Sequence, residues 1–139
     1  MRYILTGLLL LYSAYTDIRR REISIIALLL FGIGACICML CGRSASAAEI
    51  AGGAATGIFL LFISHLTRGE LGEGDGCLLA VTGILLGFRE NLMLLFGALF
   101  LSAVFSAFLF LVKRNLRDKY PFVPFLFLSY SIMMGGGVI

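Results

Sequence analysis

The chain has 139 residues, of which 60% are hydrophobic and only 14% are charged, whereas soluble domains carry roughly 25% charged residues. A water-soluble domain of this size cannot bury that much apolar surface, because its surface-to-volume ratio is too high. The composition therefore excludes a soluble enzyme, a nucleic-acid-binding domain and a disordered protein, and the net charge of +3 does not indicate a nucleic-acid partner.

Six segments without Asp, Glu, Lys or Arg are the predicted transmembrane helices. In chain order they cover residues 3–16, 23–42, 50–67, 76–88, 91–112 and 120–139. A span needs about 20 residues to cross the hydrocarbon layer, so the first and fourth segments are short. Barrel strands alternate apolar and polar residues and these runs do not, which favours helices. The first segment resembles a signal peptide without a clean cleavage site, and we expect it to be a retained span.

The distribution of basic residues predicts the orientation. With six crossings and the N-terminus outside, eight of the eleven Lys and Arg residues lie on the inner side, mostly within residues 19–21 and 113–119. If the fourth segment did not cross, the split would be nearly even. The positive-inside rule therefore favours an all-α protein of six transmembrane helices with both termini outside. We expect one domain over residues 1–139, embedded in the lipid bilayer of the cell membrane.

Two glycine pairs have the G-x-x-x-G spacing, Gly53 with Gly57 and Gly83 with Gly87. Such pairs let two helices approach closely enough for dispersion contacts and weak hydrogen bonds to act. We therefore expect both pairs to lie where helices touch.

Two aspartates stand at the inner ends of the two short spans. Asp17 ends the first span and Asp75 begins the fourth. If these helices extend past their aspartates, the two carboxyl groups reach one depth in one half of the bundle. An ionisable residue at that depth is costly and is a functional candidate by default.

Two facing carboxyl groups in a low-dielectric cleft share one proton, because they cannot both ionise easily. The ionised group can take a proton from water while the protonated group donates to a carbonyl oxygen. This chemistry is aspartic peptide hydrolysis, which needs neither a metal nor a cofactor. The plain alternative is that Asp17 pairs with Arg20 or Arg21, and that Asp75 only caps its helix.

Glycines surround the second aspartate in the run Gly72-Glu73-Gly74-Asp75-Gly76. Glycines are poor helix formers, adopt backbone conformations that other residues avoid, and let another backbone approach closely. We expect Gly72, Gly74 and Gly76 to form an active-site loop on which an extended substrate pairs like a strand. A flexible turn is the alternative.

At these motifs the sequence resembles the type IV prepilin peptidase family and, more widely, the G-x-G-D intramembrane aspartyl proteases. Asp17-Ile18-Arg19-Arg20-Arg21-Glu22-Ile23 and Gly72-Glu73-Gly74-Asp75 are similar to its two motifs, and Tyr120-Pro121-Phe122-Val123-Pro124-Phe125 to the start of its last helix. The resemblance covers nearly the whole chain. It implies that the short basic leader is cleaved from prepilin or pilin-like proteins at the cytosolic face, with Asp17 and Asp75 as the catalytic pair.

The sequence departs from the family pattern at three positions. Ser24 stands where the family usually has Pro, Ile25 where Asn is common, and Cys77 where Lys often follows the aspartate. These departures concern the loop geometry and the local charge and leave both aspartates in place. We expect the compact form found with tight-adherence pili or resembling the archaeal preflagellin enzymes. N-methylation of the product, which the longer bifunctional members perform, is not implied.

The resemblance suggests a role in substrate binding for two acidic residues. Prepilin leaders are rich in Lys and Arg, and six of the eight acidic residues of this chain map to the inner side. We hypothesise that Glu70 and Glu73 attract the positive charges of the leader. The alternative is that both are solvated loop charges.

Four other polar residues are interpreted as structural. Cys36, Cys38 and Cys41 have a spacing that suggests a metal or a disulfide, but positions 36 and 38 of one helix face different ways, which favours packing. His65 has no ligand partner at a suitable spacing and is interpreted as an interfacial or packing residue.

The competing functions are another G-x-G-D protease, a proton-coupled transporter that uses the two aspartates as a relay, and a non-catalytic subunit of pilus assembly.

Overall fold

The computed structural model describes residues 2–20, 24–40, 46–67, 72–113 and 121–137. These residues form helices α1 (Arg2–Arg20), α2 (Ile25–Leu40), α3 (Ala47–Leu66), α4 (Glu73–Leu86), α5 (Phe88–Lys113) and α6 (Val123–Gly135), and no strand is present among them. The helices fall on the six predicted apolar segments, so the all-helical prediction is confirmed. The boundaries differ by a few residues, and α1 continues past Asp17 as expected for a short span that carries its aspartate.

Two of the described helices are long and apolar enough to cross a membrane, over Ala47–Leu66 and Phe88–Val112. Ile25–Ile37 and Val123–Gly135 are shorter apolar helices. Large hydrophobic side chains are exposed along these helices, as at Leu111, which is 81% exposed. A soluble monomer rarely exposes apolar patches on this scale, so the helices fit a membrane-associated protein. The count of six crossings and the side of the termini stay predictions.

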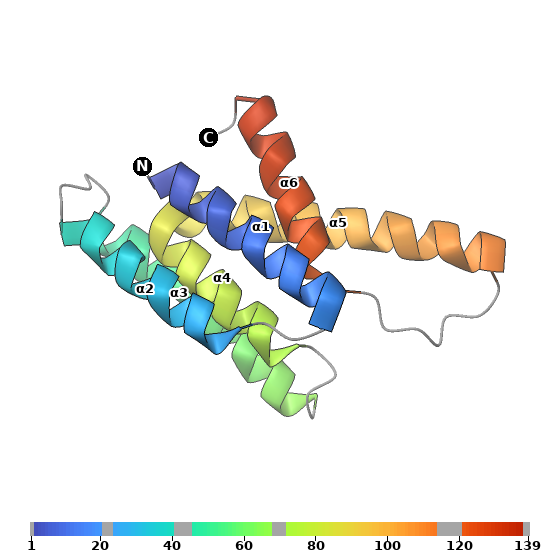
Figure 1. Ribbon diagram of the computed structural model, residues 1–139, viewed down its shortest axis with the longest axis horizontal. Coiled ribbons are helices and arrows are strands. Elements are labelled where there is room, and N and C mark those ends of the chain that lie inside the picture. The colour runs from blue at the N-terminus through green and yellow to red at the C-terminus, as the bar shows by residue number, and fades with distance from the viewer. Residues whose placement is uncertain (1, 21–23, 41–45, 68–71, 114–120, 138–139) are drawn as a thin grey trace.

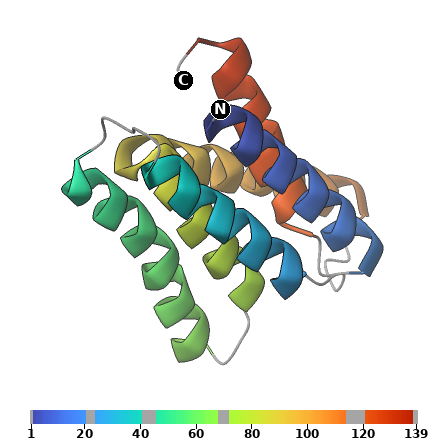
Figure 2. The same ribbon diagram turned by 60° about the vertical axis from the view of Figure 1, so that its left-hand side comes forward.

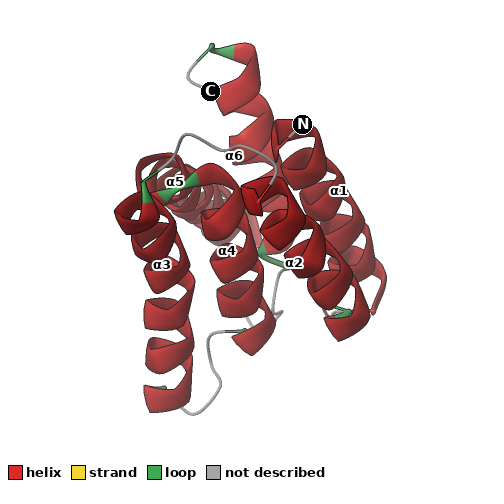
Figure 3. Ribbon diagram, turned by 90° about the vertical axis from the view of Figure 1, so that its left-hand side faces the viewer, coloured by secondary structure: helices red, strands yellow, loops and turns green. Residues whose placement is uncertain are grey.

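Helix α4 lies inside the bundle. It packs between α2 and α3, and α1 lies beside α2 and α4 (Figure 2, Figure 3). Helix α6 packs against α1 and α5, and the second half of α5 projects beyond the other helices (Figure 1). The start of α1 and the end of α6 share one end of the molecule, where the Tyr130 hydroxyl donates to the carbonyl of Tyr3 at 2.6 Å. The end of α1 therefore meets the start of α6 at the opposite end.

The contact between α3 and α4 depends on glycines. A Cβ atom at Gly53 would overlap the carbonyl of Gly83, and one at Gly57 would overlap the backbone of Ala80. The predicted close approach is therefore confirmed for these three glycines. Gly87 also lies at this contact, because a Cβ atom at Gly53 would lie 3.0 Å from its carbonyl carbon. It ends α4 with φ 99°, a left-handed conformation that favours glycine.

A buried polar network joins α3, α4 and α5. The side-chain amide of Asn91, which is completely buried, donates to the hydroxyl of Thr56 at 2.5 Å and to the carbonyl of Leu79 at 3.0 Å. Its side-chain oxygen accepts a hydrogen bond from the hydroxyl of Thr82 at 2.8 Å. Because these polar groups satisfy one another, the network fixes the three helices relative to each other.

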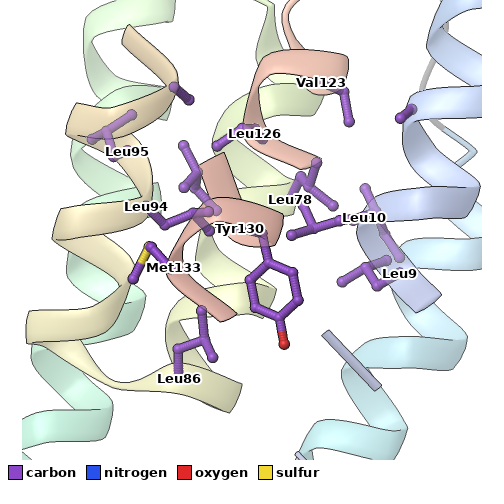
Figure 4. Packing of buried hydrophobic residues seen from close by; sticks show 14 residues of the cluster. Leu9, Leu10, Leu78, Leu86, Leu94, Leu95, Val123, Leu126, Tyr130 and Met133 are labelled. Carbon is purple, nitrogen blue, oxygen red and sulfur yellow. The ribbon is translucent and has the colours of Figure 1, made fainter. Parts of the chain in front are cut away.

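The apolar core lies where α1, α4, α5 and α6 meet (Figure 4). Leu10, Leu78, Leu94 and Leu126, one from each of these helices, are completely buried. Leu78 lies one turn after Asp75 on α4. The core therefore packs α4 against α1 one turn after Asp75.

Candidate active site

Asp17 lies near the end of α1 and is bonded to the start of α6. Its carboxylate Oδ2 accepts a hydrogen bond from the backbone N–H of Val123 at 3.1 Å. The first N–H groups of a helix have no partner within the helix and carry partial positive charge, so a carboxylate is favourable there. This bond joins two segments that are far apart in the sequence.

Asp75 lies in the first turn of α4, three residues after the N-cap Gly72. Helix α4 contacts α1, and the negative charge of Asp17 acts on Asp75. Both side chains are partly buried. The structure thus brings the two predicted carboxyl groups to the same end of the bundle, within electrostatic reach of each other.

The surroundings of the two carboxyl groups differ. Burial, followed by the charge of Asp17, raises the pKa of Asp75 to about 7. Burial also raises the pKa of Asp17, and the hydrogen bond from Val123 only partly offsets this rise. Both aspartates lie just outside the apolar segments 3–16 and 76–88 that are predicted to span the membrane. The asymmetry favours a proton on Asp75 and a negative charge on Asp17.

The plain structural roles for the two aspartates find little support. In the described part of the chain, no ion pair joins Asp17 to Arg20, and the one ion pair links Arg2 to Glu90 at 3.5 Å, far along α1. Arg21 lies outside the described residues. Asp75 is inside the first turn of α4 and is not its N-cap.

The prediction of a glycine loop around Asp75 is wrong in its secondary structure. Gly74 and Gly76 lie in the first turns of α4, and only Gly72 precedes the helix. None of the three has a positive φ. Gly76 is buried, and a Cβ atom there would lie 2.7 Å from Cγ of Leu61 on α3. Packing of α4 on α3 therefore overrides the low helix propensity of this run.

Of the two glutamates predicted to bind the basic leader, only one lies within the described residues. Glu73 is exposed at the first residue of α4, which suits a group that meets a charged peptide. Glu70 lies outside the described residues, as do residues 114–120 of the basic cluster. The role of both glutamates stays a prediction.

The cysteines and the histidine add nothing to the aspartate pair. Cys36 is exposed on α2, so the predicted packing within the protein is wrong for this side chain. Cys41 lies outside the described residues, and the side chain of Cys38 is not described. His65 is exposed in the last turn of α3, which fits an interfacial residue and not a packed one.

The role of Val123 was not predicted from the sequence. Its backbone N–H, and not its side chain, reaches Asp17. A signal was present in the Pro-containing run 121–124, because Pro marks the first turn of a helix and its unpaired N–H groups. Nothing in the sequence pairs that helix start with α1.

Comparison with known proteins gives one match. A family model described as the type IV leader peptidase family matches residues 4–111, a range that includes Asp17 and Asp75. No curated protein and no solved structure matches the chain.

Proposed function

Because the chain belongs to the type IV leader peptidase family, we propose that it is an intramembrane aspartic endopeptidase that removes the short basic leader from prepilin-like proteins. The observation that carries the aspartic mechanism is the convergence of Asp17 and Asp75 at one end of the bundle. The hydrogen bond from Val123 favours the charged form of one carboxyl group, and burial favours the neutral form of the other.

The mechanism follows from this asymmetry. Asp17 begins ionised and takes a proton from a water molecule, whose oxygen attacks the carbonyl carbon of the scissile bond. Asp75 begins protonated and gives its proton to the carbonyl oxygen. When the tetrahedral intermediate collapses, the C–N bond breaks, the amine leaves with the proton from Asp17, and Asp75 takes a proton back from a hydroxyl. Both carboxyl groups return to their starting states.

We place this site at the cytosolic face of the cell membrane, within a single domain of six crossings. The supporting observation is that the end of α1 and the start of α4 carry the aspartates, next to the basic residues 19–21. A substrate with a basic leader in the cytosol and an apolar helix in the bilayer brings its scissile bond to this level. Glu73, together with Glu70, attracts the leader.

The test is cleavage of a candidate prepilin by the wild type and by the Asp17→Asn and Asp75→Asn variants, purified in detergent. Asn keeps the size of Asp and removes the titrating proton, so each variant should lose leader removal while it stays folded, with a melting temperature at or above that of the wild type. Glu49→Gln is a matched control, because Glu49 is an exposed acid at the start of α3. Cleavage at the wild-type rate by both Asn variants would overturn the aspartic mechanism.

The family match favours a peptidase over a transporter or an assembly subunit. A second candidate is a G-x-G-D protease that acts on another membrane substrate. The choice of substrate distinguishes it from a prepilin peptidase. If the protein cleaves a membrane peptide without a basic leader as fast as a prepilin, the prepilin assignment fails and the aspartic mechanism stands.

A further inference from the structure

Ser13 is a buried hydroxyl group without a hydrogen-bond partner, one turn before Asp17 on α1. Its relative exposure is 1%, and its Oγ atom bonds to nothing in the structure. Across the described residues, the only other buried side-chain atom in this state is Oε2 of Glu90, which belongs to the ion pair at the far end of α1. An unsatisfied buried hydroxyl is costly, so a group at this position that has no visible partner requires an explanation.

Other hydroxyl groups on α1 and in the core have partners. Thr6 and Thr16 donate to backbone carbonyls of the preceding turn, at 2.9 and 3.0 Å. The buried hydroxyls of Thr82 and Ser129 bond to groups on neighbouring helices. The hydroxyl of Ser13 is therefore free to bond a group that the described chain does not supply in this state.

The position of Ser13 connects it to the aspartate pair. It precedes Asp17 by four residues, so the two side chains share one face of the helix. Helices α1 and α6 run antiparallel, because Asp17 meets Val123 while Gly7 packs against Tyr130. Ser13 lies between these two contacts and faces the inside of the bundle, one turn deeper than Asp17.

We propose that Ser13 is a positioning residue whose hydroxyl donates a hydrogen bond to the Asp17 carboxylate, directly or through one water molecule, in the working enzyme. The inference rests on the proposed function. The N–H of Val123 already serves Oδ2, and a donor from the bundle interior serves the other oxygen. Two donors orient the carboxylate and stabilise its negative charge, so the shared proton stays on Asp75.

Few charged groups compete with these donors. Asp75 faces Asp17 from α4, and Glu73 is exposed at the start of the same helix. The described residues of α2 and α6 contain no Asp, Glu, Lys, Arg or His. Arg19 and Arg20 are exposed at the end of α1. The hydrogen-bond donors are therefore expected to decide how the pair shares its proton.

The test is the pH profile of leader cleavage by the wild type and by the Ser13→Ala and Thr6→Ala variants. In Ser13→Ala, Asp17 loses a donor to its charged form, so the acidic limb should move to higher pH by about one unit. The variant should stay folded, because the substitution removes only the hydroxyl group from a buried side chain. Thr6→Ala removes a buried hydroxyl of the same helix that has its own partner, and its acidic limb should match the wild type.

An unchanged acidic limb in Ser13→Ala would overturn the inference, because a hydroxyl that only fills space cannot move a titration. If Ser13→Ala shows no cleavage at any pH, Ser13→Thr decides, since it keeps the hydroxyl. Cleavage by Ser13→Thr with a wild-type acidic limb supports the inference, and an equal loss overturns it. Failure of the proposed function is distinguishable, because in that case Asp17→Asn itself retains cleavage.

Discussion

The carboxylate of Asp17 accepts a hydrogen bond from the backbone N–H of Val123, which ties the end of α1 to the start of α6. This bond gives Asp17 a structural task besides its proposed chemical one. It also separates the effects of two substitutions, because the side-chain oxygen of Asn can still accept the bond and the methyl group of Ala cannot.

We therefore expect Asp17→Asn to lose leader cleavage and keep its stability. Asp17→Ala should lose cleavage and also lower the free energy of unfolding by about 1 kcal/mol, the usual contribution of one hydrogen bond. Thermal denaturation in detergent, run beside the cleavage assay, measures both quantities. Equal melting temperatures for the two variants would show that the bond to Val123 contributes nothing to stability.

The raised pKa of Asp75 predicts a pH dependence of stability. Its pKa rises from 3.8 to about 7 in the folded protein, so between these values the folded state binds a proton that the unfolded state has released. Stability should therefore fall as the pH rises from about 4 to about 7, and the loss should persist above pH 7. Asp75→Asn removes this titration and should melt higher than the wild type at pH 8, with a smaller difference at pH 4. The same difference in melting temperature between Asp75→Asn and the wild type at both pH values would contradict the raised pKa of Asp75.

The same pKa sets the basic limb of the cleavage profile. Asp75 must carry a proton to donate to the scissile carbonyl, so the rate should fall as the pH rises through about 7. The measurement is kcat/KM against pH with a leader peptide whose own groups do not titrate in that range. A rate that stays level to pH 9 would show that Asp75 is not the acid.

Two glycines beside Asp75 should respond differently to alanine. A Cβ atom at Gly76 would lie 2.7 Å from Cγ of Leu61, so Gly76→Ala should overpack the contact between α3 and α4 and cost about 1–3 kcal/mol of stability. A Cβ atom at Gly72 would lie 2.8 Å from Oδ2 of Asp75, and the backbone there has an ordinary φ of −60°. Gly72→Ala should therefore fold normally and cleave more slowly, because the carboxylate must move.

Melting temperature and cleavage rate, measured for both glycine variants, separate the two effects. If Gly72→Ala cleaves at the wild-type rate, the carboxylate of Asp75 has room to move without consequence. If Gly76→Ala melts like the wild type, the packing between α3 and α4 is looser than the structure indicates.

Much of this fold follows from the sequence, because each apolar run in a bilayer has to satisfy its own backbone and so becomes a helix. The placement of Asp17 and Asp75 at helix ends follows as well. The state of Gly74 and Gly76 does not, because local propensity favours a loop and only the packing of α4 against α3 makes the run helical. The partner of Asp17 was missed for a similar reason, because pairing a carboxylate with the Val123 N–H depends on how α1 and α6 cross.

Asn91 holds α4, the helix that carries Asp75, through hydrogen bonds of its side chain. Its amide donates to Thr56 and to the carbonyl of Leu79, so the site around it presents acceptors. Asn91→Asp keeps the shape but replaces the donor with a buried acceptor or charge, which leaves groups unsatisfied and should cost about 3 kcal/mol or more. The loss should shrink at acidic pH, where the protonated carboxyl group regains a donor.

Thermal melting of Asn91→Asp at two pH values, with Ser102→Ala as the control, measures this effect. Ser102 lies on the same helix, is only partly buried, and bonds within its own turn, so its loss should leave stability nearly unchanged. Because α4 is held by Asn91 on one side and carries Asp75 at its start, Asn91→Asp should also slow cleavage more than Ser102→Ala does. A wild-type melting temperature for Asn91→Asp would mean that water reaches the buried polar network. The placement of α4 would then depend on its glycine contact with α3 alone.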